Sequence, residues 1–223
     1  LAGADAAYVA YAPDLAVPGA PERVEALAAL AARRGLRRLV LLSGRGEDGA
    51  RRAEDAVLAA FPGATVVRCA WFMQNFSEDF LLDAVRAGTL ALPVGDVPEP
   101  FVDVRDVADV AVAALLEDGH AGRVHELTGP EPLTFAQVAT TLSRATGRDV
   151  AFVPLPVAEF TGALRAGGVP DDAVALLEYL FTEVLDGRNS AATDDVARVL
   201  GRPARRFADY AREVAAGGVW NPA

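Results

Sequence analysis

The first 70 residues alternate short apolar runs with helical patterns, and this alternation limits the fold more than any other feature. The apolar runs at 4–12, 36–43 and 64–70 are typical of strands that are buried on both faces of a sheet. The stretches between them repeat apolar side chains at helical spacing. Strand, helix and strand in this order predict right-handed crossovers and a parallel sheet.

Local signals place further elements. The first helix is expected to start near Pro21 and end at Gly35, and Asp48 is expected to cap the second. The rest of the chain predicts a helix capped by Ser77 and ending at Gly88, a helix opening at Asp103, a strand over 124–128, a helix over 135–146 capped by Thr134, and a mostly helical last third.

Composition removes several classes of function. All 21 basic residues are arginine, and 31 acidic residues give a formal net charge of -10. Such a chain lacks the positive charge that nucleic acids and anionic membranes attract. The absence of lysine removes Schiff-base and phosphate-loop lysine chemistry. One cysteine, two histidines and no apolar run of about 20 residues predict a soluble cytoplasmic protein without disulfides, metal or membrane span.

The loop GRGEDG was compared with the phosphate-binding pattern G-x-G-x-x-G. Gly44, Gly46 and Gly49 have the required spacing, between a strand and a helix. The pattern also requires an acidic residue at the end of the next strand, about 20 residues further on. The chain has Val66 and Val67 in that stretch, so the pyrophosphate site is not assigned to this loop.

Six segments between Gly3 and Trp220 follow one another in a recognisable order. They are GADAAYVAYAP, LVLLSG, VVRCAWFMQNF, PFVDVRDVADVAVAAL, HELTGPEPLTFAQVATTLSRATG and GRPARRFADYA. This order resembles the NmrA-like branch of the atypical short-chain dehydrogenases, and RCAWFMQNF is its most specific part. The resemblance implies an α/β fold with a doubly wound parallel Rossmann-type sheet, a smaller, mainly helical substrate-binding region, and NADP or NAD as cofactor.

The start of the chain resembles the end of a helix that enters the fourth strand of a Rossmann sheet. We therefore expect about two β-α units, each of roughly 30 residues, to precede Leu1. The main phosphate-binding loop is expected there.

The resemblance also implies a site. The expected cofactor contacts are Tyr11, Ala12, Pro13, Ser43, Gly44 and Trp71. The expected substrate contacts are Trp71, Phe72, Gln74, Asn75 and Phe76. Ser43 and Asn75 are the candidate catalytic residues. No tyrosine is followed four residues later by lysine, so the proton has to come from water or from another group.

Each of these residues also has a structural interpretation. Ser43 is equally suited to ending a strand or capping a loop. Trp71, Phe72 and Phe76 are residue types that dominate protein cores. Their neighbours Gln74 and Asn75, directly after a parallel strand, favour a ligand pocket instead.

The remaining polar residues are interpreted as structural. Asp103 and Asp106, at the start of a helix, fit capping and dipole stabilisation worth about 1 kcal/mol. His120 and His125 are not assigned as bases, and Cys69 in a buried strand is expected to be inert. An exposed face of ion pairs is expected at Arg51, Arg52 and Glu54.

Residues 1–70 are expected to form the C-terminal part of the Rossmann domain. Residues 71–100 and 125–191 are expected to form the substrate-binding region, and 101–124 and 192–223 to return to the Rossmann domain. The function that this organisation favours is hydride transfer from NAD(P)H to a small apolar acceptor such as a quinone, an imine or an enone. Two alternatives stay open: a non-catalytic dinucleotide-sensing regulator, and a shortened chain with a non-redox or structural role. A homodimer is one expected assembly.

Overall fold

The computed structural model describes residues 3–221, which fall into two compact units. Unit 1 contains the chain up to Ala70 together with Arg105–Thr128 and Thr193–Ala204. Unit 2 contains Trp71–Val104, Gly129–Ala192 and the chain from Arg205 onward. Leu1, before which further β-α units are expected, lies outside the described residues.

Unit 1 is built on a four-stranded sheet with the order β1-β2-β3-β5. Its strands are β1 (Ala6–Val9), β2 (Arg38–Gly44), β3 (Thr65–Cys69) and β5 (Val124–Leu127), and all neighbouring pairs are parallel. The three strands expected in the first 70 residues and the strand expected over 124–128 are therefore confirmed. The predicted α/β class with a parallel sheet is confirmed as well.

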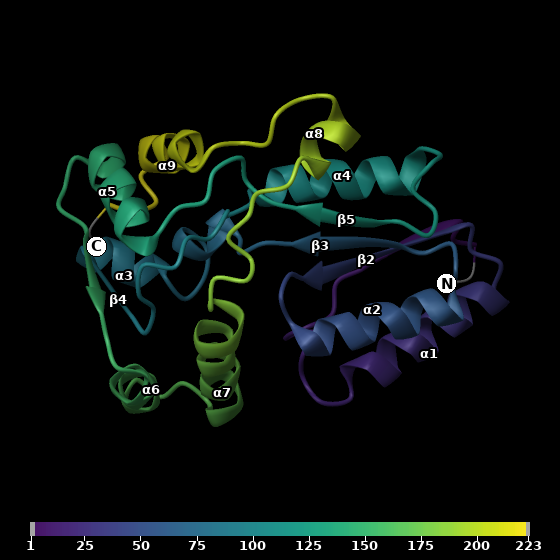
Figure 1. Ribbon diagram of the computed structural model, residues 1–223, viewed down its shortest axis with the longest axis horizontal. Coiled ribbons are helices and arrows are strands. Elements are labelled where there is room, and N and C mark those ends of the chain that lie inside the picture. The colour runs from purple at the N-terminus through teal and green to yellow at the C-terminus, as the bar shows by residue number, and fades with distance from the viewer. Residues whose placement is uncertain (1–2, 222–223) are drawn as a thin grey trace. The chain divides into compact units, whose positions relative to one another are not determined.

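Helices cover both faces of this sheet. Figure 1 shows α1 (Ala20–Arg33) and α2 (Asp48–Ala60) on one face and α4 (Val104–Leu116) on the other. The short α8 (Asp195–Leu200) lies on the same side as α4. Aliphatic side chains pack between α1, α2 and the sheet. The buried residues of this cluster include Val24, Ala28, Leu39, Leu41, Ala53, Val57 and Val66.

Unit 2 is mainly helical. After a 3-10 turn (Met73–Phe76) it contains α3 (Leu82–Ala87), α5 (Phe135–Thr146), α6 (Val157–Ala166), α7 (Asp171–Tyr179) with a π-helical continuation (Leu180–Val184), and α9 (Phe207–Ala216). A parallel pair of strands, β4 (Thr89–Leu92) and β6 (Ala151–Pro154), completes it. Sequence patterns did not reveal β6, because its four residues carry no alternation of buried and exposed positions.

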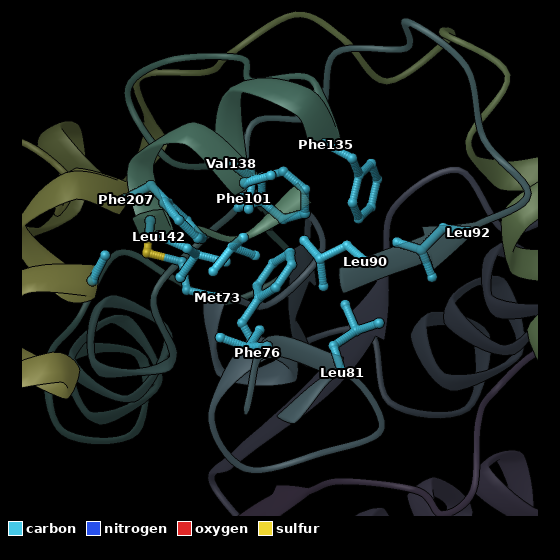
Figure 2. Packing of buried hydrophobic residues seen from close by; sticks show 14 of the residues in the cluster. Met73, Phe76, Leu81, Leu90, Leu92, Phe101, Phe135, Val138, Leu142 and Phe207 are labelled. Atoms are coloured by element: carbon cyan, nitrogen blue, oxygen red, sulfur yellow. The ribbon is translucent and has the colours of Figure 1, made fainter. Parts of the chain in front are cut away.

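Aromatic rings fill the core of unit 2. Phe76 is fully buried, with ring centroids 5.5 Å from Phe101 and 5.4 Å from Phe207. Figure 2 shows Phe76, Leu90, Phe101 and Phe135 gathered in this core. Such edge-to-face pairs add about 0.5–1.5 kcal/mol each beyond their buried area.

The predicted N-terminal caps of three helices are confirmed in one case and wrong in two. Thr134 caps α5 through a complete capping box with Gln137, which confirms the predicted start of this helix. The predicted caps Asp48 and Ser77 are wrong. Glu47 occupies the cap position of α2, and Ser77 Oγ instead accepts a hydrogen bond from the Tyr210 hydroxyl at 2.7 Å.

The units divide the chain differently from the expected grouping. Residues 101–104 and 192, which were expected to return to the Rossmann domain, belong to unit 2. Residues 125–128 belong to unit 1, because Val124–Leu127 is a strand of its sheet, although 125–191 was grouped with the substrate-binding region. Residues 205–221 belong to unit 2, because Phe207 and Tyr210 of α9 are buried in its aromatic core. No helix within residues 3–221 has the length and apolar character needed to cross a membrane.

Candidate functional site

The ends of β1, β2 and β3 lie at one edge of the unit 1 sheet, because these strands are parallel. We call this the carboxyl edge; it includes residues 10–19 after β1 and residues 45–47 after β2. Open α/β sheets bind ligands just beyond this edge. The structure therefore brings the expected cofactor contacts of unit 1 together.

Tyr11, Ala12 and Pro13 remain accessible at the carboxyl edge. Ala12 and Pro13 are exposed and joined by a cis peptide bond, and Tyr11 is partly exposed. The Tyr11 hydroxyl accepts a hydrogen bond from Arg23 Nη1 at 2.8 Å. These residues offer backbone groups and a positioned phenol to a ligand, and their contact with a cofactor stays a prediction.

Ser43, near the end of β2, is only 4% exposed. Its hydroxyl donates a hydrogen bond to Glu54 Oε1 at 2.7 Å. A hydroxyl with this partner satisfies a buried carboxylate, which accounts for the serine without any chemistry. The catalytic role of Ser43 stays a prediction.

Glu54 is buried, so its predicted place on an exposed ion-pair face is wrong. It is 1% exposed. Arg68 donates hydrogen bonds to both of its carboxylate oxygens, with Nε 2.9 Å from Oε1. Arg68 also donates to Glu126. The register of the strands causes this arrangement, because it pairs Ser43 with Arg68 and Arg68 with Glu126 on one face. The hydrogen bond to Glu54 raises the pKa of Arg68.

The glycines of the GRGEDG loop have packing roles. A Cβ at Gly44 would overlap the Glu47 carboxyl group, and a Cβ at Gly49 would lie 2.5 Å from Ala16 Cα. Gly46 has a φ of 85°, which favours glycine. Because an acidic side chain occupies the space above the first glycine, the loop does not fit a pyrophosphate.

Glu47 is the functional candidate that sequence reasoning missed. It is 9% exposed, and its Oε2 is the one buried side-chain oxygen or nitrogen without a hydrogen-bond partner in the described part of the chain. Burial raises its pKa to about 9, helped by the charge of Asp14, a shared hydrogen bond with Asp14, and the charge of Glu54. The available signal was an acidic pair inside a glycine loop directly after a buried strand.

Unit 2 contains the expected substrate contacts, which follow β3 directly. Trp71 and Phe72 are partly exposed, whereas Phe76 lies in the aromatic core. The Trp71 ring contacts Phe181, with centroids 5.1 Å apart, and its backbone N–H donates to Glu99 Oε1 at 3.3 Å. Trp71 and Phe72 therefore retain surface for a ligand, and Phe76 supports them from inside the unit.

Gln74 and Asn75 differ in what their side chains contact. Gln74 Nε2 donates to Asp103 Oδ1 at 3.0 Å, and its Oε1 accepts from Val104 N at 3.0 Å, so it caps the start of α4. The partly exposed amide of Asn75 makes no side-chain hydrogen bond to any residue from 3 to 221. Asn75 is thus the amide that remains available to a ligand.

Asp103 and Asp106 are structural, but by ion pairing rather than capping alone. Both are fully buried. Asp103 accepts from Arg205 Nη1 at 2.6 Å, and Asp106 accepts from Arg202 Nη1 at 2.6 Å. Each buried carboxylate thus has its own cation.

The two histidines and the cysteine lie in unit 1. His120 Nδ1 and His125 Nε2 are 3.0 Å apart. Burial, the neighbouring His120 and two arginines lower the pKa of His125 to about 4, so it is neutral at pH 7. Burial raises the pKa of the Cys69 thiol, which disfavours the reactive thiolate.

A parallel sheet with helices on both faces and its accessible residues at the carboxyl edge defines a Rossmann-type α/β protein. Within that class the chain belongs to the NmrA-like family, whose model matches residues 57–200.

Proteins similar to this chain in sequence include named reductases. The chain is 35% identical over 153 residues to the NAD(P)H azoreductase of Xenophilus azovorans, covering 68% of this chain and 53% of the azoreductase. It is 36% identical over 199 residues to the (4-alkanoyl-5-oxo-2,5-dihydrofuran-3-yl)methyl phosphate reductase of Streptomyces griseus, covering 86% of this chain and 70% of that enzyme.

Among solved structures, the NADPH-dependent quinone oxidoreductase of Escherichia coli, in complex with NADPH, superposes with a TM-score of 0.80. The two sequences are 19% identical, and the match covers 95% of this chain and 77% of the oxidoreductase. This similarity concerns the fold. The match with the azoreductase spans about half of that relative's length.

Proposed function

We propose that this chain is part of an NAD(P)H-dependent reductase that transfers hydride to a small apolar acceptor such as a quinone, an imine or an enone. The observation that carries this proposal is the accessible carboxyl edge of a Rossmann-type sheet in an NmrA-like chain whose relatives include an NAD(P)H azoreductase and a (4-alkanoyl-5-oxo-2,5-dihydrofuran-3-yl)methyl phosphate reductase. The bound nicotinamide would supply the hydride.

The residues have separate roles in this proposal. The backbone of Tyr11, Ala12 and Pro13 and the end of β2 at Ser43 and Gly44 hold the nicotinamide half of the cofactor. No stretch within residues 3–221 is assigned to the pyrophosphate, since Glu47 fills the space above the glycine loop.

The segment after β3 is proposed to bind the acceptor. Trp71 and Phe72 offer flat apolar surface, and Asn75 has the unpaired amide that can polarise an acceptor oxygen or nitrogen. Gln74 and Phe76 position this segment through the start of α4 and the aromatic core. The chain's contribution is orientation of the reactants rather than covalent catalysis.

The test combines calorimetry with NADH and NADPH and an assay of reduced-nicotinamide absorbance with a panel of quinones, imines and enones. Oxidation of either cofactor supports the proposal, and comparing the two decides between NAD and NADP. Binding without turnover would instead support a dinucleotide-sensing regulator. If the chain neither binds nor oxidises the cofactor, the non-redox role is the one supported.

We also propose that the protein works in the cytoplasm, where the buried thiol of Cys69 would stay reduced. Cell fractionation with an antibody to the chain tests this placement. Light scattering of the purified protein tests the expected homodimer.

A further inference from the structure

Three aromatic rings of unit 2 lie against one another at the start of the segment that is proposed to bind the acceptor. The ring centroids of Trp71 and Phe181 are 5.1 Å apart, those of Trp71 and Phe80 are 6.4 Å apart, and those of Phe80 and Phe181 are 6.3 Å apart. Trp71 and Phe80 are partly exposed, whereas Phe181 is 2% exposed. We call these three residues the aromatic platform.

The indole of Trp71 is fixed by its backbone and by its neighbours. The Trp71 N–H donates to Glu99 Oε1 at 3.3 Å, and the Trp71 carbonyl accepts from the N–H of Val102 at 2.8 Å. The fully buried ring of Phe135 packs on the indole with centroids 6.3 Å apart and an angle of 88° between the planes. Phe181 packs on the same indole at an angle of 60°. Packing therefore sets the plane of the Trp71 ring.

The polar edge of the Trp71 indole is available to a ligand. Its Nε1–H makes no hydrogen bond to any residue from 3 to 221. The buried Trp220 differs, because its Nε1–H donates to the carbonyl oxygen of Phe76 at 2.6 Å. Tryptophan N–H groups usually find a partner when the ring is buried. The partly exposed Trp71 thus combines a fixed ring with a donor that an acceptor oxygen or nitrogen can use.

Phe181 reaches the platform from an irregular turn of helix. The π-helical turn over Leu180–Val184 continues α7, and the N–H of Leu185 donates to the carbonyl of its first residue at 3.1 Å, a bond of the i→i+5 type. The side-chain amide of Asn189 donates to the last carbonyl of the turn at 3.3 Å. Such turns are rare and are found frequently at functional sites. This one is held at both ends and fixes the position of Phe181.

We propose that Phe181 is a positioning residue that sets the plane of the Trp71 indole, and that the aromatic platform selects flat, electron-poor fused-ring acceptors such as naphthoquinones. This rests on the proposed acceptor site and narrows its substrate class. The face of an indole is electron-rich, so it stacks favourably on an electron-poor ring. A small puckered ring has less flat area to stack, although its carbonyl can accept the same Trp71 N–H.

The experiment measures acceptor binding without cofactor, by equilibrium dialysis of menadione, a naphthoquinone, and of cyclohexenone. Phe181→Leu is compared with the matched control Phe207→Leu, a similarly buried ring that packs on Phe76 and Phe101. We expect cyclohexenone to bind the parent chain at least about tenfold more weakly than menadione. The menadione Kd should rise about three- to tenfold in Phe181→Leu, the size of one aromatic pair, and change less than about twofold in Phe207→Leu.

A second measurement reports the Trp71 ring itself. Near-ultraviolet circular dichroism is recorded for each chain and for its Trp71→Phe counterpart, and the difference removes the signal of Trp220. This difference should shrink in Phe181→Leu and be retained in Phe207→Leu, because only the first ring packs on the indole. Urea denaturation checks that each variant is folded. Phe181→Met, which keeps apolar volume, replaces Phe181→Leu in both measurements if the latter does not fold.

The outcomes separate this proposal from the proposed function. A parent chain that does not bind menadione, or that binds cyclohexenone equally well, would overturn the selection by the platform. Equal losses of menadione affinity in Phe181→Leu and Phe207→Leu, or an unchanged indole signal in Phe181→Leu, would overturn the role of Phe181. Menadione binding that depends on Phe181, without oxidation of NADH or NADPH, would support the platform and remove the reductase function. Turnover together with unchanged menadione affinity in Phe181→Leu would leave the reductase and remove this role.

Discussion

Glu54 and Glu47 lie seven positions apart in unit 1, and their surroundings are opposite. Glu54 accepts hydrogen bonds from the Arg68 guanidinium and from the Ser43 hydroxyl. Glu47 has its pKa raised by burial and by the charges of Asp14 and Glu54, and its Oε2 has no hydrogen-bond partner within residues 3–221. Burial with a matched cation favours a fixed charge, whereas burial against another acid favours a bound proton. Glu47, in the loop after β2, and Glu54, in α2, are both buried, and they can therefore have different functions.

The largest expected effect comes from removing the cation of Glu54. Arg68→Met would leave Glu54 charged and buried without its partner, which typically costs about 3–5 kcal/mol. Urea denaturation at pH 7 measures the free energy of unfolding. Arg51→Met is the control, because Arg51 is exposed and 4.0 Å from Glu54, and should change stability by less than about 0.5 kcal/mol. Equal losses in the two variants would contradict the assigned pairing.

The next largest effect is a gain in the free energy of unfolding when the Glu47 carboxyl group is removed. The folded pKa of Glu47, about 9, lies above the ordinary value of 4.5, so between these values the unfolded chain releases a proton that the folded chain keeps. Stability is therefore lost as the pH rises through this window. Glu47→Gln should stabilise the chain by about 1–3 kcal/mol at pH 8 and change it little at pH 5. Denaturation of both proteins at the two pH values provides the comparison, and a variant that is less stable at pH 8 would refute the buried proton.

Ser43→Ala separates the structural from the catalytic interpretation of Ser43. Removing one hydrogen bond to a carboxylate that keeps Arg68 should cost about 1 kcal/mol. Under the structural interpretation, the turnover of properly folded protein stays within a few-fold of the parent. A loss of about a hundredfold in turnover with unchanged thermal stability would instead establish Ser43 as catalytic.

The smallest expected effect on stability comes from His125, a buried base whose pKa is lowered rather than raised. Its folded pKa of about 4 lies below the ordinary 6.5, so in acid the unfolded chain takes up a proton that the folded chain resists. Stability is lost as the pH falls from 6.5 towards 4. His125→Gln should reduce this acid dependence by about 0.5–1 kcal/mol between pH 7 and pH 5. An unchanged slope would show that His125 protonates freely in the folded chain.

Local patterns predicted the elements of unit 1 because apolar residues run together in its first strands and recur at a fixed period in its helices. The same holds for α5, where Thr134 and Gln137 cap each other within one turn. Predictions that depended on distant partners did worse. Ser77 was assigned to a helix cap, but its partner Tyr210 lies 133 residues away. No local rule reveals such a contact.

The candidate site divides in the same way. The positions of Tyr11, Ser43 and Trp71 at the ends of successive strands follow from the order of elements, which the sequence contains. The roles of Gln74 and Asn75 do not, because only the folded chain shows that Gln74 is occupied by Asp103 and Val104. The two amides are neighbours in sequence, and their availability differs.

By itself, the sequence determined the α/β class, the parallel sheet, the family and the lack of a tyrosine–lysine pair. Those features depend on periodicity, residue order and residue type, which are local properties of the chain. Only the tertiary structure decided which acid is paired and which holds a proton. Strand register sets Arg68 beside Ser43 and Glu126 and within reach of Glu54, and the loops after β1 and β2 bring the charge of Asp14 near Glu47. The ionisation of a buried group depends on neighbours in space, and folding brings these neighbours together from distant parts of the chain.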